Sequence, residues 1–105
     1  MLNKELLKGF SPIIILSVLS DEAKYGYQIV KDIKKKSDKS LNIAEGTLYP
    51  LLHKLEKEKM LYSFWQEAGG RKRKYYALSA KGKKALKTQK NDWQLFLKTM
   101  HQVID

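Results

Sequence analysis

The stretch from Leu61 to Ser79 constrains the fold of this chain more than any other. Two aromatic-rich runs, at residues 61–67 and 74–79, lie on either side of the Gly69-Gly70 pair. Aromatic residues favour strands, and a glycine pair permits a tight turn between two antiparallel strands. The stretch therefore predicts a β-hairpin, whose tip carries the consecutive cations Arg71, Lys72, Arg73 and Lys74.

The segments before the hairpin have helical periodicity. Residues 2–19 are apolar on more than one face, which predicts a largely buried helix. Ser11-Pro12 fits either a kink in one helix or the start of a second, and the sequence leaves both open. After a turn at residues 20–24, a second helix with a basic end is predicted from apolar residues that should face the core: Tyr27, Ile29, Val30 and Ile33.

A third helix is predicted to begin near Ala44 or Glu45, after the polar stretch at residues 37–40. Its buried stripe follows the spacing i, i+3, i+4, i+7 and consists of Leu48, Leu51, Leu52 and Leu55. Pro50 lies inside this stripe, where a proline removes a backbone donor and ordinarily breaks a helix. We nevertheless predict one continuous helix, because the leucine spacing runs through the proline without a shift.

The last segment, residues 79–104, predicts a long helix. Leu86, Trp93 and Met100 recur every seven residues, and the same stripe includes Phe96, Leu97, Val103 and Ile104. The predicted fold is thus mainly α with a small β-hairpin, in the order of a winged helix-turn-helix followed by a long C-terminal helix. We expect residues 1–78 to form the winged helix-turn-helix domain and residues 79–105 to form a dimerisation helix.

Charge and composition narrow the function. The formal net charge of +10 on 105 residues suits a phosphate polyanion, and acidic membranes or proteins would satisfy it equally. The longest apolar run is far shorter than the roughly 20 residues of a membrane-spanning helix. Because cysteine is absent and no nucleophile or metal-ligand pattern occurs, we expect a cytoplasmic protein with no membrane partner, no metal, no cofactor and no enzymatic activity.

The residues left outside the core predict contact with DNA. On the third helix the outward-facing side chains are suited to base edges, thymine methyls and phosphate oxygens: Thr47, Tyr49, Pro50, His53, Lys54 and Lys57. At the hairpin, Arg71 to Lys74 form a run with no acidic residue within it. We therefore expect the third helix to enter the major groove and the hairpin to contact the phosphate backbone.

Three blocks of residues also resemble a known family. They are Tyr25-Gly26-Tyr27-Gln28-Ile29, then Gly46-Thr47-Leu48-Tyr49-Pro50-Leu51-Leu52 with Leu55-Glu56, then Gly70 to Ser79 with Gly82. In this order they are similar to the PadR family of bacterial transcription regulators. The resemblance implies a winged-helix repressor in which the C-terminal helix packs against the partner's N-terminal helix.

The resemblance also implies roles for single residues. It places Thr47, Tyr49 and Pro50 in the recognition helix and Tyr25 near a phosphate. Many relatives have serine or threonine followed by proline before Gly46, whereas this chain has Ala44-Glu45. Since Glu45 would repel a phosphate, we expect its side chain to face away from DNA.

A homodimer is predicted on two grounds. The resemblance implies one, and independently a small winged helix cannot cover both its own core and the C-terminal apolar stripe. The residues expected at the interface are Phe10, Ile13, Leu86, Trp93, Phe96, Leu97, Met100, Val103 and Ile104. A two-fold dimer would read half-sites about one helical turn, or a multiple of it, apart.

Some small PadR proteins carry a tryptophan at the place of Trp93 and hold flat aromatic drugs between subunits. The resemblance thus makes Trp93, Phe96 and Leu97 candidate contacts for a small hydrophobic aromatic effector, although simple packing of Trp93 in the dimer core is the alternative. Leu97 stands where drug-sensing relatives can have an acidic residue, so a neutral or weakly charged ligand is expected. Two other functions stay open, a nonspecific architectural nucleic-acid binder and a protein-interaction adaptor.

Overall fold

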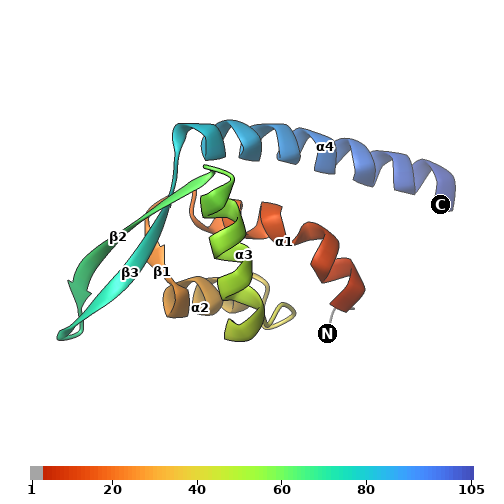
Figure 1. Cartoon of the computed structure of the whole chain (residues 1–105). Helices are drawn as coiled ribbons and strands as arrows, with labels where there is room; N and C mark the ends of the chain where they lie inside the picture. The colour runs from red at the N-terminus through yellow and green to blue at the C-terminus, as the bar shows by residue number, and fades with distance from the viewer. Residues whose placement is uncertain (1–3) are drawn as a thin grey trace.

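The computed structural model describes residues 4–105, and Leu2 of the expected first helix lies outside the described residues. Figure 1 shows helices gathered beside a twisted sheet, with a long final helix crossing above them and extending past them. The elements are α1 (Lys4–Val18), β1 (Lys24–Tyr25), α2 (Gly26–Lys36), α3 (Glu45–Lys57), β2 (Leu61–Ala68), β3 (Arg71–Leu78) and α4 (Ala80–Ile104). The prediction of a winged helix-turn-helix with a long C-terminal helix is confirmed.

The core lies where α1, α2, α3 and the base of the sheet meet. Its buried side chains come from every one of these elements, and they include Ile15, Leu16, Ile29, Ile33, Leu48, Leu52, Leu55, Leu61, Tyr76 and Leu78. Leu86 from the start of α4 is buried in the same cluster. The beginning of α4 is therefore packed into the core, and only the later part of the helix lies outside it.

Both prolines lie inside continuous helices. Pro12 is within α1, so of the two alternatives for residues 2–19 the structure shows a single helix over its described part. Pro50 is within α3, and the prediction of an unbroken third helix is confirmed. Pro50 is the sixth residue of α3, so its missing N–H removes one bond near the start of the helix while the leucine stripe holds the rest.

The hairpin is confirmed, and its two strands pair from Leu61↔Leu78 to Ala68↔Arg71. Gly69 and Gly70 have φ values of +62° and +80°, a left-handed pair that glycine adopts without strain. The sheet has a third strand that the sequence did not predict, because β1 contains only two residues and carries no alternation. The predicted turn at residues 20–24 thus ends in an edge strand.

A buried lysine holds that edge strand. Lys24 lies opposite Tyr76 in β3, and its Nζ donates to the carbonyl of Val18 at 2.8 Å and to Oδ1 of Asp21 at 2.6 Å. The hydrogen bond from Lys24 lowers the pKa of the Asp21 carboxyl. Because its ammonium group has these partners, Lys24 can be buried and still tie β1 to the end of α1.

The start of α4 is fixed to the turn between α3 and β2. We call this contact the α4 joint, formed by Lys59, Met60, Ser79 and Gly82. The Ser79 hydroxyl accepts from the N–H of Gly82 at 3.0 Å, as an N-cap, and donates to the carbonyl of Lys59 at 2.6 Å. The N–H of Ser79 donates to the carbonyl of Met60 at 3.0 Å, so two backbone turns are joined directly.

The turn on the other side of the joint is a helix-ending motif. The N–H of Met60 donates to the carbonyl of Leu55, and the N–H of Lys59 donates to the carbonyl of Glu56, each at 3.0 Å. Lys59 has a φ of 67°. This is the hydrogen-bond pattern of a Schellman motif, and it stops α3 sharply. The chain leaves α3 at a fixed angle and enters β2 beside the first turn of α4.

No helix within residues 4–105 is both long enough and apolar enough to cross a membrane.

The α4 joint requires glycine at position 82, because a Cβ there would lie 3.0 Å from the carbonyl carbon of Met60 and closer still to its oxygen. We expect Gly82→Ala to lower the free energy of unfolding by about 1–3 kcal/mol, the usual cost of overpacking, measured by urea denaturation. Gly46→Ala is the matched control, because nothing lies within 4 Å of its Cβ position and alanine favours helix. Equal stability of the two variants would contradict a tight joint.

Candidate nucleic-acid interface

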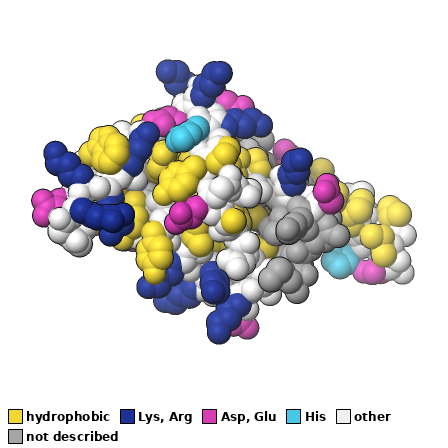
Figure 2. All heavy atoms as spheres, turned by 60° about the horizontal axis from the view of Figure 1, so that its bottom comes forward, with side chains coloured by type: hydrophobic (Ala, Val, Ile, Leu, Met, Phe, Trp, Pro, Cys, Tyr) yellow, Lys and Arg dark blue, Asp and Glu magenta, His cyan; other side chains and the backbone are white. Residues whose placement is uncertain are grey.

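A concave surface of about 610 Å³ lies between the wing, the start of α2 and the exposed side of α3. We call it the reading groove. It is lined by aromatic and basic side chains with one carboxylate: Tyr25, Gly26, Tyr27, Glu45, Tyr49, His53, Trp65, Arg71, Lys72, Arg73, Lys74 and Tyr76. Figure 2 looks toward this side of the molecule, where Lys and Arg side chains surround hydrophobic ones.

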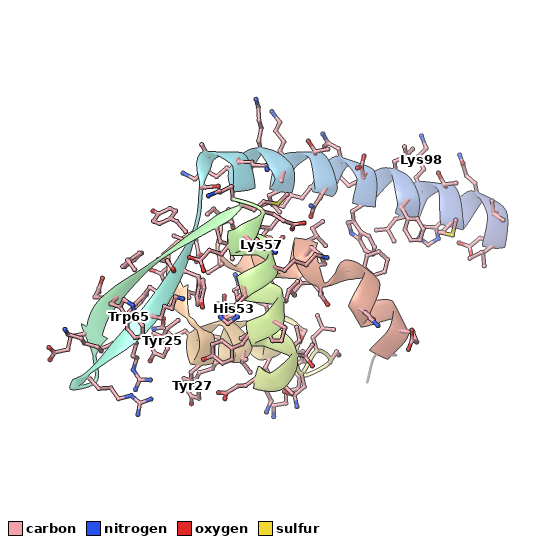
Figure 3. All side chains as sticks on the ribbon, in the orientation of Figure 1. Tyr25, Tyr27, His53, Lys57, Trp65 and Lys98 are labelled. Atoms are coloured by element: carbon pink, nitrogen blue, oxygen red, sulfur yellow. The ribbon has the colours of Figure 1, made fainter. Side chains whose placement is uncertain are left out.

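The side chains predicted to face outward on α3 are all exposed, namely Thr47, Tyr49, Pro50, His53, Lys54 and Lys57. Two of them, Tyr49 and His53, lie one turn apart with ring centroids separated by 6.5 Å, and both line the reading groove. Figure 3 shows His53 facing the space beside the wing and Lys57 a turn further along α3. The outer surface of α3 thus offers hydroxyl, imidazole and ammonium groups within one continuous strip.

Tyr49 is held in place by the start of α2. A Cβ on Gly26 would lie 2.8 Å from Cζ of the Tyr49 ring, so the ring packs directly on the glycine backbone. Tyr25 caps α2 from the preceding position, where its N–H donates to Oε1 of Gln28 at 3.2 Å. The Tyr25-Gly26 pair therefore fixes how closely α2 and α3 approach each other at the groove.

The four cations of the wing have different surroundings. Arg71 and Lys72 are exposed next to the turn. Arg73 is partly buried: its Nε donates to the carbonyl of Ala68 at 3.1 Å, and its guanidinium lies 4.6 Å above the centre of the Tyr25 ring. The wing therefore presents two free charges and one that orders the groove wall.

Lys74, the fourth cation, is paired across the groove. Its Nζ lies 3.9 Å from Oε1 of Glu56 on α3 and 5.5 Å from the centre of the Tyr76 ring. Glu56 also accepts a short hydrogen bond from the hydroxyl of Ser63 on β2. Glu56 thus joins α3 to both strands of the wing, a role that the sequence did not indicate.

The floor of the groove is a buried phenol. Tyr76 is almost fully buried in the core, and burial raises the pKa of its hydroxyl, with the charge of Glu56 adding to the effect. The hydroxyl of Tyr76 thus stays protonated at neutral pH. It presents a neutral polar group beneath the charged walls.

Three residues of the groove differ from the sequence expectations. Tyr27 was expected in the core, but it is 56% exposed, because it is only the second residue of α2 and precedes the buried stripe. Glu45 was expected to face away from DNA, but it lines the groove. Trp65 was assigned no role beyond strand formation, yet it is 67% exposed on the groove side of β2.

The residues predicted for the dimer and the effector lie elsewhere, between α1 and α4. Trp93 packs edge-on against Phe10 with ring centroids 4.8 Å apart, and it stacks on Phe96 at 6.0 Å. Ile13, Phe10 and Trp93 line two hollows of about 560 and 440 Å³. Leu97, Val103 and Ile104 are exposed beyond this cluster and Met100 is half-buried, whereas Leu86 lies inside the core of its own subunit.

Within residues 4–105 no group of three or more His, Cys, Asp or Glu side chains could hold a metal ion.

The chain is similar to known regulators along its length. A family model, "Transcriptional regulator PadR-like family", matches residues 15–88. A transcriptional regulator structure from Clostridium thermocellum is 33% identical, with 96% of this chain and 99% of that chain covered and a TM-score of 0.88. A PadR family transcription regulator from Clostridium difficile is 31% identical, with coverages of 92% and 100% and a TM-score of 0.81.

A PadR-like transcriptional regulator from Bacillus cereus is also 31% identical, with coverages of 96% and 97% and a TM-score of 0.84. These matches extend over the winged helix and α4 together, so the agreement covers the reading groove and the final helix. The family is one of transcription regulators and not of enzymes. This chain belongs to the PadR-like family of transcriptional regulators.

Proposed function

We propose that the protein is a homodimeric repressor that binds a specific operator in double-stranded DNA and is released from it by a small aromatic ligand. The observation that carries the DNA part is the reading groove, where α3 and a basic wing border one concave surface. We assign residues 1–78 to DNA binding and residues 79–105 to dimerisation. The protein would act in the cytoplasm, where bacterial DNA lies.

The arrangement of the groove suits base contacts by α3 and phosphate contacts by the wing. α3 enters the major groove, where Thr47, Tyr49 and His53 reach base edges. Arg71 and Lys72, which have the most exposed charges of the wing, contact phosphates. Glu45 lines the same groove and repels phosphate, so it favours placements in which a base edge or a water lies beside it.

The dimer is supported by an uncovered apolar face on α4. At 100° per residue, Trp93, Phe96, Leu97, Met100, Val103 and Ile104 all fall on one side of the helix. Val103 and Ile104 are 75% and 74% exposed in the single chain, and the end of α4 extends beyond the helices beneath it (Figure 1). Apolar surface of this kind is covered by a partner, and the smaller hollow beside Phe10 and Ile13 would receive the partner's α4.

The effector site is supported by the aromatic cluster of Phe10, Trp93 and Phe96. The larger hollow beside Trp93 is lined mainly by apolar side chains, and its polar lining includes the cations Lys36 and Lys90. A planar neutral or weakly acidic compound fits this lining better than a strong cation, which the two ammonium groups would repel. A ligand there would lie between α1 and α4, in the proposed dimer contact.

DNA binding is tested by fluorescence anisotropy, with the DNA upstream of the protein's own gene and a random duplex of equal length, over a range of salt. We expect a large preference for the upstream DNA.

Arg71→Ala/Lys72→Ala should weaken binding to both duplexes and lower the slope of log K against log salt by about 2, since each lost phosphate contact removes about 0.9. Lys98→Ala, on the distant α4 (Figure 3), is the control. Equal, salt-steep binding to both duplexes would favour an architectural binder, and no binding would favour an adaptor.

The dimer is tested by sedimentation equilibrium. The wild type should have about twice the 12.2 kDa mass of one chain. Leu97→Glu/Val103→Glu places two charges in the proposed interface, so it should shift the mass toward one chain and weaken operator binding. Lys98→Glu, about 140° around α4 from Trp93, should stay dimeric. A wild type that sediments as a single chain would refute this interface.

The effector site is tested through Trp93 in the variant Trp65→Phe, which leaves Trp93 as the sole tryptophan. Neutral planar aromatic compounds should quench or shift its fluorescence, and the same compounds should lower operator affinity. Matched cationic analogues should bind more weakly. A fluorescence signal that no compound in the panel changes would leave Trp93 as a packing residue.

A further inference from the structure

Trp65 is a large apolar side chain in a charged place. It lies in β2, it is 67% exposed, and it lines the reading groove with Tyr27 and Tyr49. Keeping an indole in water is unfavourable, because a tryptophan buries on the order of 150–250 Å² when covered. An exposed indole in a groove is therefore suited to contact with a ligand that binds in the groove.

The side chains around Trp65 on its face of the wing are mostly polar or charged. In the hairpin register Trp65 lies opposite Lys74, and Glu67 lies opposite Lys72. Strand side chains alternate between faces, so Trp65, Lys72 and Lys74 share one face of the wing. Lys74 is already paired with Glu56, which leaves Lys72 and the adjacent Arg71 to meet external anions.

A flat apolar group beside free cations matches the chemistry of the DNA backbone. A nucleic-acid strand alternates anionic phosphates with sugars, whose faces consist largely of C–H groups. The cations can pair with phosphates while the indole covers a sugar, and the indole Nε1–H can donate to a phosphate oxygen. A protein partner is a poorer fit, because the walls of this groove carry the polar strip of α3 and the wing cations together.

We propose that Trp65 is a DNA-contacting residue, whose indole packs on the deoxyribose backbone beside the phosphates held by Arg71 and Lys72. The proposal rests on DNA binding as the function of the reading groove. It makes the wing an apolar as well as an electrostatic contact. The contribution of Trp65 should therefore differ from that of the cations in its response to salt.

The first test measures affinity for the preferred duplex by anisotropy at several salt concentrations. Trp65→Ala should weaken binding about tenfold at every salt concentration, with an unchanged slope of log K against log salt, because the substitution removes no positive charge. Trp65→Phe should weaken it less, since a smaller ring keeps part of the contact. Tyr62→Ala is the matched control, because Tyr62 is 53% exposed on the opposite face of β2 and should leave affinity unchanged.

The outcomes separate this proposal from the function it rests on. If Trp65→Ala binds as the wild type does while Arg71→Ala/Lys72→Ala binds more weakly, the role of Trp65 is refuted and DNA binding stands. If Trp65→Ala changes the salt slope, or if Tyr62→Ala weakens binding equally, the specific apolar contact is refuted. If the wild type binds no DNA, both proposals fail. Thermal melting should show the same Tm for Trp65→Ala and the wild type, because the indole is exposed.

A second test asks directly whether DNA covers the indole. The fluorescence difference between the wild type and Trp65→Phe reports Trp65 alone, since Trp93 is present in both proteins. Acrylamide should quench this difference signal strongly in the free protein and at least twofold less at saturating duplex. Quenching that saturating duplex does not reduce would show an indole still open to solvent, and would overturn the proposal.

Discussion

The hydrogen bonds of Ser79 set the geometry on which the other parts of this molecule depend. Its hydroxyl caps α4 and reaches the turn that follows α3, while its N–H binds the carbonyl of Met60 in the same turn. Gly82 lets the first turn of α4 approach that carbonyl without a side chain between them. One small contact therefore fixes the end of the recognition helix, the base of the wing and the direction of α4.

A second connection, through Glu56, joins α3 to the wing. Because Glu56 binds Ser63 in β2 and pairs with Lys74 in β3, the two walls of the reading groove are held by one carboxylate. The ion pair with Glu56 leaves fewer unpaired cations on the wing. The net charge of +10 thus overstates the charge of the wing, because many of the lysines lie in α2 and α4. In the proposed complex with DNA, selectivity would then depend on shape and on apolar contact as well as on charge.

The sequence was sufficient for the fold wherever a pattern repeated. The leucine spacing predicted α3 as one helix that continues past Pro50. The glycine pair predicted the wing turn, because this two-residue turn needs the left-handed backbone conformation that glycine adopts without strain. The edge strand β1 could not be predicted, since two residues carry no periodicity and their pairing with β3 depends on tertiary packing.

The candidate site was predictable only in part, for a similar reason. Exposed positions of α3 followed directly from its buried stripe. Tyr27 has the spacing of the core stripe in α2 but lies in the first turn, where the helix has emerged from the core, so only the structure shows it in the groove. The pairing of Lys74 with Glu56 joins residues far apart in sequence, and no local pattern indicates it.

The rigid attachment at Ser79 gives α4 the mechanics of a lever. With 25 residues and a rise of about 1.5 Å per residue, the helix is about 37 Å long; it is hydrogen-bonded at its Ser79 end and packs on Phe10 through Trp93, and the part beyond Trp93 is largely exposed. A tilt of about 5° at the fixed end moves the far end by about 3 Å, and the same tilt turns α3 and the wing as one body. In the proposed dimer, small changes where two such helices meet would therefore change the spacing and angle between the two DNA-binding domains.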